Sequence, residues 1–422
     1  MSQGQSQVPT GQDQDEVTGM VCLESDLQDG QMKEVEVEEQ KILLIRTQGQ
    51  YSAVGSKCSH YGAPLIKGAL FGDRVRCPFH GACYNVKTGD IEEYPGLDCL
   101  PTYKVKVEDG EVYVSSLNVY KRVKEMSCRV PGVNHIILLI GGGPASLLCA
   151  ETLRQNHYEG RIIIVTKDTL PPIDKPKLSK AMHLDSASLL LRPMDFFQQH
   201  DIELWTQKKM LEENKVTFYM NDEVVEIRGQ NGKVKEVVLK SGAVLKTDVV
   251  IAGIGVIPNS DFLKGSSVEV DSRKAVIIDK FMRTNIPDVF GAGDVTSFPL
   301  ALRKDQRVNI GHWQLASAHG RVAALNMLQK QTEIVSVPFF WTVLLGKSIR
   351  YTGYAEGYTE IIYKGKVEER KFLAFYIKDD QVVAAASLMF DPAVARVAEI
   401  MSNGQVITKA QAQSDDLSWL QM

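Results

Sequence analysis

Short runs in which apolar and polar residues alternate fill the first quarter of the chain and predict β-strands. These runs lie at Lys33–Val37, Ile42–Ile45, Arg74–Cys77, Tyr103–Val107 and Glu111–Val114. Turn-forming pairs such as Asp29-Gly30 separate them. We therefore expect an all-β domain over residues 16–118. A polar tail at 1–15 precedes it and has too few apolar residues to fold.

The hydrophobic pattern changes after a linker at 119–134. A continuous apolar strand, Ile136–Ile140, runs into three glycines, and a helical pattern follows at Ala145–Gln155. The apolar run Ile162–Val165 predicts a second strand. Strand, helix and strand in this order form a βαβ unit, whose two strands are parallel.

The rest of the chain mixes both patterns. Strands are predicted at Val216–Tyr219, Glu223–Arg228, Val234–Leu239, Val249–Ile251, Lys371–Ile377 and Val382–Leu388, and helices at Ala316–Leu328 and Ala393–Met401. The sequence thus predicts a multidomain protein in which an all-β domain is followed by an α/β part and an α+β C-terminal domain.

Composition limits the partners and the compartment of this 422-residue chain. A net charge of −4 gives no general attraction to nucleic acid or anionic membranes. No apolar run reaches the ~20 residues of a membrane-spanning helix. The seven scattered cysteines favour a reducing compartment, and no presequence is visible. From the sequence alone we expect a cytoplasmic protein that binds no nucleic acid and has no membrane span.

Two short motifs in the β-rich part combine cysteine with histidine. Cys58-Ser-His60 is followed, after sixteen residues, by Cys77-Pro-Phe-His80. In a Rieske 2Fe–2S centre, two cysteines bind one iron and two histidines bind the other. A tetrahedral zinc site is the alternative, but zinc fingers supply a cysteine pair and then a histidine pair, whereas the two types alternate here. We predict that Cys58, His60, Cys77 and His80 hold a 2Fe–2S cluster.

The residues around these ligands predict a low reduction potential. High-potential Rieske proteins carry a further cysteine in each loop, at places taken here by Ala63 and Phe79. Ala82 stands where a serine hydroxyl would donate to a sulfur. Fewer hydrogen bonds to the sulfurs make the reduced, more negative cluster less favourable.

A glycine-rich turn follows the strand Ile136–Ile140 and opens the next helix. Gly141-Gly-Gly143-Pro144-Ala145-Ser146 is a variant of the Gly-x-Gly-x-x-Gly fingerprint with serine in the last place. The first glycine permits the tight turn, and Gly143 lets the backbone approach a pyrophosphate at the positive end of the helix. The ribose-binding acidic residue is less clear, since Asp168 comes one or two places late.

A second glycine turn lies farther along the chain, at Gly291-Ala-Gly293-Asp294. It is typical of the second FAD fingerprint in flavoproteins with two dinucleotide-binding domains, where the aspartate binds the ribityl chain. With both segments present, we predict FAD as the second cofactor.

With these motifs the chain resembles the Rieske-containing members of the apoptosis-inducing factor family. Three further runs agree with that family: Leu178-Ser179-Lys180, the segment 248–258 and His312-Trp313-Gln314. The resemblance implies that Lys180 lies near the flavin ring, Asp294 at the ribityl chain and Trp313 near the isoalloxazine.

The resemblance also implies an organisation and a location. FAD-binding segments would lie at 135–210 and 283–330, a remnant of the NAD(P)-binding domain at 211–282, and a C-terminal reductase domain at 331–422. The family points to mitochondria.

The chain departs from the family pattern between the two flavin segments. A full reductase has a second glycine fingerprint there, in a βαβ unit of ~30 or more residues that binds NAD(P)H. Here Asp201–Thr206 passes almost directly into Lys208–Lys215. We therefore expect that an internal segment is missing, that the two-dinucleotide-binding flavoprotein is incomplete and that NAD(P)H binding is doubtful.

Two functions stay open at this point. In the first, electrons pass from NAD(P)H through FAD to the Rieske cluster of the same chain, and no separate acid–base residue is needed. In the second, the protein is a Rieske electron carrier or an apoptosis-related interaction protein whose truncated reductase part no longer binds NAD(P)H. The electron acceptor is unknown in both, and homodimer formation is open.

Overall fold

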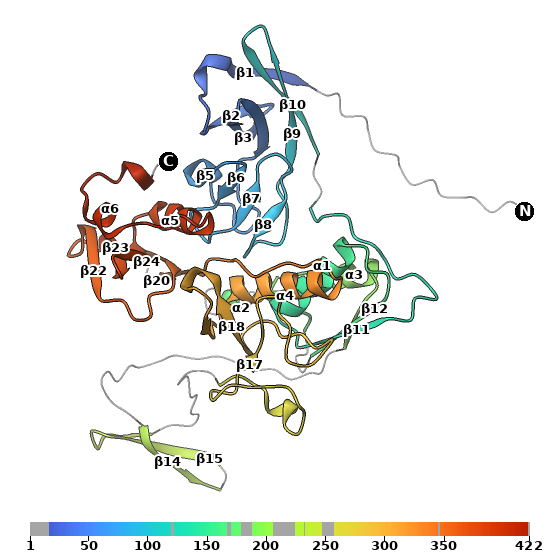
Figure 1. Ribbon diagram of the computed structural model, residues 1–422, viewed down its shortest axis with the longest axis vertical. Helices are drawn as coiled ribbons and strands as arrows, with labels where there is room; N and C mark the ends of the chain where they lie inside the picture. The colour runs from blue at the N-terminus through green and yellow to red at the C-terminus, as the bar shows by residue number, and fades with distance from the viewer. Residues whose placement is uncertain are drawn as a thin grey trace, which may run out of the picture.

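A computed structural model describes residues 17–119, 122–166, 170–178, 188–205, 224–231, 233–246, 257–344 and 347–420. Figure 1 shows an N-terminal β-rich region in blue and cyan, a helix-containing region in green and gold, and a C-terminal region in orange and red. The expected strands at Val216–Tyr219 and Val249–Ile251 lie outside the described residues, as do Asp168 and the expected flavin contact Lys180.

The N-terminal region contains two antiparallel sheets. The larger has the order β1-β10-β9-β4-β3-β2, with β1 Thr18–Leu23, β2 Gln31–Val37, β3 Gln40–Thr47, β4 Gln50–Gly55, β9 Thr102–Glu108 and β10 Glu111–Val119. The smaller consists of β5 Ala69–Phe71, β6 Arg74–Arg76, β7 Cys83–Asn85 and β8 Ile91–Glu93. Short 3-10 turns lie at Glu24–Asp26 and Leu65–Lys67. The predicted all-β domain is confirmed.

Strand β3 contributes side chains to both hydrophobic cores of this region. Its side chains alternate between two cores, with Leu43 and Ile45 in one and Ile42 and Leu44 in the other. All four are fully buried. A strand covered on both faces reads as a continuous apolar run, as this one does.

The helix-containing region is built on a parallel sheet of order β11-β12-β13. Its elements are β11 Ile136–Ile140, α1 Pro144–Gln155, β12 Arg161–Val165, α2 Lys175–Leu178, α3 Met194–Gln199 and β13 Ile202–Trp205. Helix α4, Trp313–Met327, lies alongside α1 (Figure 1). Gly320 permits this approach, because a Cβ there would collide with the carbonyl of Ala145. The predicted βαβ unit is confirmed.

Two small sheets complete this part of the chain. One contains β17 Val276–Ile277, β18 Thr296–Leu300 and β19 Gln306–Val308, with 3-10 turns at Asp261–Leu263 and Ala301–Arg303. The other, β14 Val224–Gln230, β15 Lys233–Leu239 and β16 Val244–Lys246, lies apart from the rest of the described molecule in Figure 1.

The C-terminal region is an antiparallel sheet of order β20-β21-β24-β23-β22 covered by helices. Its elements are β20 Phe339–Leu344, β21 Lys347–Gly353, β22 Glu360–Lys366, β23 Lys371–Lys378, β24 Gln381–Leu388, α5 Ala393–Ser402, α6 Lys409–Gln413 and a 3-10 turn at Ser418–Leu420. This is the α+β domain that the sequence predicts. No helix in the described ranges is long and apolar enough to span a membrane.

Candidate functional site

The four residues predicted to bind the cluster lie on two loops with the same backbone geometry. In each loop the cysteine N–H, of Cys58 or Cys77, donates to the carbonyl of the alanine five residues later, at 2.8 Å. The glycine four residues after the cysteine donates back to the cysteine carbonyl, at 2.9 Å for Gly62 and 3.1 Å for Gly81. Both glycines have positive φ, 69° and 77°. Since glycine adopts this conformation without strain, the two glycines let the loops close tightly.

The side chains of these residues form a cysteine pair and a histidine pair. The two thiols share a hydrogen bond, which lowers the pKa of Cys58 to about 7 and raises the pKa of Cys77 well above its usual value. The rings of His60 and His80 have centroids 4.9 Å apart. In the described part of the chain, no three His, Cys, Asp or Glu side chains converge as the ligands of a single metal ion would. This two-and-two arrangement fits the two irons of a Rieske cluster better than one tetrahedral zinc ion.

Tyr84 on β7 is a contact of this site that the sequence analysis missed. Its buried hydroxyl lies 3.1 Å from Sγ of Cys58 and 2.9 Å from Oγ of Ser59. Ser59 in turn donates to the carbonyl of Asp98 at 2.7 Å. A thiolate at Cys58 can only accept, so the Tyr84 hydroxyl would donate to it. The low potential expected from Ala82 stays a prediction, and Tyr84 acts against it.

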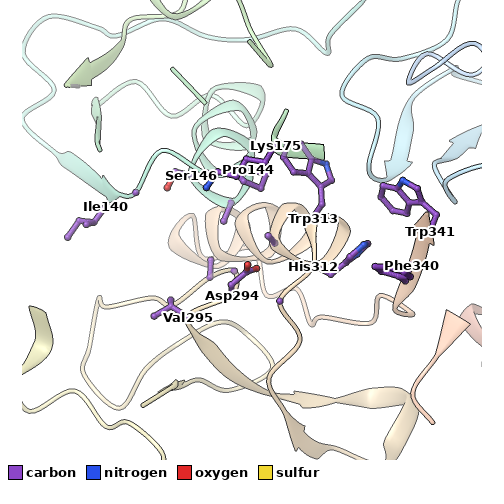
Figure 2. A pocket seen from close by; sticks show the side chains of 17 residues that line it. Ile140, Pro144, Ser146, Lys175, Asp294, Val295, His312, Trp313, Phe340 and Trp341 are labelled. Carbon is purple, nitrogen blue, oxygen red and sulfur yellow. The ribbon is translucent and has the colours of Figure 1, made fainter. Parts of the chain in front are cut away.

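A cavity of about 610 Å³ lies where helices α1 and α4 begin, as Figure 2 shows. The predicted flavin contacts within the described residues all line it: Gly141, Gly143, Pro144, Ala145, Ser146, Gly293, Asp294 and Trp313. A Cβ at Gly143 would meet no atom within 4 Å, and Gly141 has a φ of 115°. The glycine turn therefore leaves open space at the start of α1, which suits the pyrophosphate of a dinucleotide.

Asp294 reaches this cavity from a turn that α4 holds in place. The N–H of Gly293 donates to Nδ1 of the buried His319 at 3.2 Å, and the Thr296 hydroxyl donates to the Gly293 carbonyl at 2.8 Å. Burial raises the pKa of Asp294, and the charge of Lys175 opposes that shift. An aspartate among mostly apolar neighbours suits the hydroxyl groups of a ribityl chain.

The far end of the cavity is formed by residues that were not predicted as flavin contacts. His312, Phe340 and Trp341 line it, and Lys175 lines it from α2. Figure 2 shows Trp341 on β20, beside the pale blue ribbon of the N-terminal region. The aromatic run Phe339-Phe340-Trp341 was the only signal for it in the sequence.

Trp341 contacts both candidate sites. Its ring centroid lies 5.2 Å from that of His80 and 6.3 Å from that of His60, while the same side chain lines the cavity. The side chain is buried. One indole therefore contacts both the histidines predicted to bind the cluster and the cavity lined by the residues predicted to bind the flavin.

Buried ion pairs hold the N-terminal region in this position. Arg192 contacts Asp98 at 2.5 Å and Glu151 of α1 at 2.8 Å. On the other side, the fully buried Arg76 pairs with Glu399 of α5 and with Glu93. Each pair is largely removed from water, so breaking one would leave an uncompensated buried charge.

Family comparisons match three segments of the chain. Residues 18–104 match the Rieske [2Fe-2S] domain, residues 184–320 match the pyridine nucleotide-disulphide oxidoreductase family, and residues 339–419 match the reductase C-terminal domain.

Several known proteins resemble the chain. Apoptosis-inducing factor 3 from Homo sapiens is 38% identical over 536 aligned positions, which cover 96% of this chain and 89% of that protein. Putidaredoxin reductase CamA from Pseudomonas putida is 31% identical over 176 residues, which cover 42% of this chain and 40% of that protein. The ferredoxin reductase for the CYP199A2 system of Rhodopseudomonas palustris superposes with a TM-score of 0.61 at 20% identity, over 68% of this chain and 100% of that one. The last match shows the fold alone.

The chain belongs to the apoptosis-inducing factor 3 family. It is an oxidoreductase with a Rieske 2Fe–2S domain and an FAD-dependent reductase part. The alignment with the human protein spans 536 positions, whereas this chain has 422 residues, so more than 100 aligned positions have no counterpart here. That difference agrees with the missing internal segment inferred from the sequence.

Proposed function

We propose that this protein passes electrons from a flavin bound in the 610 Å³ cavity to a 2Fe–2S cluster held by Cys58, His60, Cys77 and His80. The observation that carries the proposal is the position of Trp341. The indole lines the cavity, and its ring centroid lies 5.2 Å from that of His80. Electron transfer needs short distances between redox groups, and a buried aromatic side chain that touches both sites provides one.

The residues of the chain bind and shield rather than transfer protons. The backbone of Gly141–Ser146 would hold the pyrophosphate, Asp294 would accept from the ribityl hydroxyls, and Trp313 would cover the flavin ring. FAD, when bound, supplies the change from two-electron to one-electron transfer. Trp341 excludes water from the space between the two sites. No acid or base is required of the protein for this function.

The proposal has two forms, a full form and a carrier form, which differ in the source of the electrons. In the full form NAD(P)H reduces the flavin. In the carrier form the protein is a Rieske electron carrier that does not oxidise NAD(P)H. The missing aligned positions favour this form. A second dinucleotide fingerprint is also absent from the sequence between the two flavin segments.

A visible spectrum of the purified protein tests the proposal. We expect Rieske absorbance together with flavin bands, and both sets of bands should bleach when dithionite is added under anaerobic conditions. Bleaching with NADH or NADPH alone would establish the full form, and no response to either would establish the carrier form. A protein that contains neither flavin nor cluster would refute both.

A further inference from the structure

The two cluster loops have the same backbone, yet their surroundings differ. The second loop is covered by the C-terminal region: Gly81 lies against the ring of Phe339, and Nε of Arg350 donates to the carbonyl of Pro78 at 3.4 Å. The first loop keeps Tyr61 and Gly62 at the surface, and 46% of Tyr61 is exposed. An external protein can therefore reach the first loop while the second stays covered.

Tyr61 joins that surface to the histidine pair. Its ring stacks on His60 with centroids 3.9 Å apart and planes at 24°, and it meets the edge of His80 at 5.4 Å. Its hydroxyl donates to the buried Asp174 at 2.7 Å. The ring is thus fixed from both ends. It provides an aromatic contact to the histidines in addition to the contact with Trp341.

Two exposed lysines, Lys57 and Lys67, precede and follow Tyr61 in the same segment of the chain. Lys57 and Lys67 are exposed and flank Pro64, which forms a β-bridge with Lys57 and accepts a backbone hydrogen bond from Lys67 at 3.3 Å. Nζ of Lys177 lies 6.0 Å from the centre of the Tyr61 ring, but it also pairs with Asp174 at 3.6 Å, so the positive charge of this surface rests on Lys57 and Lys67. The chain as a whole carries a net charge of −4, so this positive group contrasts with the overall charge.

We infer that the exposed face of Tyr61, together with the exposed Lys57 and Lys67 of the same segment, is the surface at which electrons leave the protein for an acidic one-electron carrier protein. The inference rests on the proposed function, because it names the partner that the cluster serves. When bound, the cluster would supply one electron, the stacked His60 and Tyr61 would provide the path to the surface, and the metal centre of the carrier would gain that electron. No bond forms or breaks. Opposite charges at such a surface raise the rate of encounter and orient the carrier.

Two haem proteins of opposite charge serve as probes of this surface: cytochrome b5, which is acidic, and cytochrome c, which is basic. The full-length protein is reduced with dithionite, the excess is removed, and reduction of each cytochrome is followed by stopped flow. Neither NAD(P)H nor the flavin site is needed. We expect a faster reaction with cytochrome b5 at low ionic strength, and a steep fall as salt is added.

Variants locate the surface. Lys57→Gln combined with Lys67→Gln should slow the reduction of cytochrome b5 roughly tenfold at low ionic strength. Lys106→Gln, on the exposed strand β9, is the matched control and should have no effect. Tyr61→Ser should slow the reaction, whereas Tyr61→Phe keeps the ring and should retain the rate. The potential of the cluster is measured in each variant, so that a structural effect on the cluster is recognised.

Binding gives a second readout that does not depend on electron transfer. Oxidised cytochrome b5 is titrated into the air-oxidised protein by calorimetry at low and high salt. We expect salt-sensitive binding that the double lysine variant weakens and Lys106→Gln does not. Equal binding of both cytochromes, or binding unchanged in the double variant, would overturn the inference. The proposed function fails separately, if the purified protein shows no Rieske absorbance before any probe is added.

Discussion

Strand β3 of the N-terminal region and strand β11 of the flavin-binding region are both continuously apolar, but only β3 is covered on both faces. In β3, residues Ile42 to Ile45 are all fully buried between two cores. In β11, Ile136, Leu138 and Ile140 are 57%, 53% and 66% exposed. Parallel strands of this kind are normally covered on both faces. The sequence of β11 is therefore suited to a neighbour that the described part of this chain does not supply.

This difference indicates that the cluster site and the flavin site depend on different parts of the chain for their stability. Both loops that carry the predicted cluster ligands belong to a region with its own cores. The cavity for the flavin lies at the edge of a region with an uncovered strand. We expect changes in the first region to leave the second intact, and the experiments below test that independence.

The largest effect is expected for Cys77→Ser. Loss of one of four ligands should abolish the Rieske absorbance and its electron paramagnetic resonance signal, while flavin bands persist. Cys128→Ser, at an exposed cysteine, is the control and should change neither. Retention of the cluster in Cys77→Ser would refute the ligand assignment, and loss of the flavin as well would refute the independence of the two regions.

Glu399→Gln tests how firmly the N-terminal region is joined to the C-terminal region, whose helix α5 carries Glu399. It leaves the buried Arg76 with Glu93 as its remaining carboxylate partner. Breaking a buried pair costs about 3–5 kcal/mol, and we expect the lower end because Glu93 remains. Thermal unfolding should shift down, and proteolysis between the regions should become faster. Glu369→Gln, which removes an exposed pair with Lys366, should have little effect.

The stability of the flavin-binding region should depend on pH because His319 is buried in helix α4 of that region. Burial lowers the pKa of this histidine from 6.5 to about 4. The neutral ring is favoured in the folded state, so its contribution is complete above pH 6.5 and is lost as the pH falls toward 4. The loss amounts to about 3 kcal/mol, and protonation of Nδ1 would also break the hydrogen bond from Gly293.

Thermal unfolding from pH 7 to 4.5 measures this effect. We expect stability to fall less steeply in His319→Gln than in the unmodified protein, whereas the exposed His157→Gln should follow the unmodified protein. Parallel curves for all three proteins would contradict the assignment.

The smallest effect is expected at Tyr84. Replacing it by phenylalanine removes the hydrogen bond to Cys58 and makes the reduced cluster less favourable. A hydrogen bond contributes about 1 kcal/mol, and a tenfold change in equilibrium is 59 mV for one electron, so the potential should fall by roughly 40–60 mV. Redox titration measures the shift. Tyr94→Phe, at a buried tyrosine of another core, should leave the potential unchanged.

The sequence predicted those parts of the site that depend on local spacing. The alternation of Cys58, His60, Cys77 and His80 determines two short loops, and the glycines from Gly141 determine a turn before a helix. Such patterns follow from backbone conformation within a few residues. The strands that were expected in the N-terminal region are confirmed, with bounds that differ only at their ends, whereas β1, β4, β5, β7 and β8 were not predicted.

The residues that the sequence did not reveal act through contacts between distant segments. The proposed role of Trp341 depends on its contact with His80, and the position of Tyr61 depends on its hydrogen bond to Asp174. No local pattern distinguishes a tryptophan at the start of β20 from one that merely fills a core. Tyr84 was missed for a similar reason, because its hydroxyl reaches Cys58 in the other loop.

The most direct test of the account is the transfer of an electron from the flavin to the cluster within one molecule. The flavin is reduced by a light flash in the presence of an electron donor, and the cluster is followed by its own absorbance. We expect cluster reduction at a rate that does not depend on protein concentration and that falls in Trp341→Leu. A rate proportional to protein concentration, or one that is unchanged in Trp341→Leu, would contradict electron transfer through this contact.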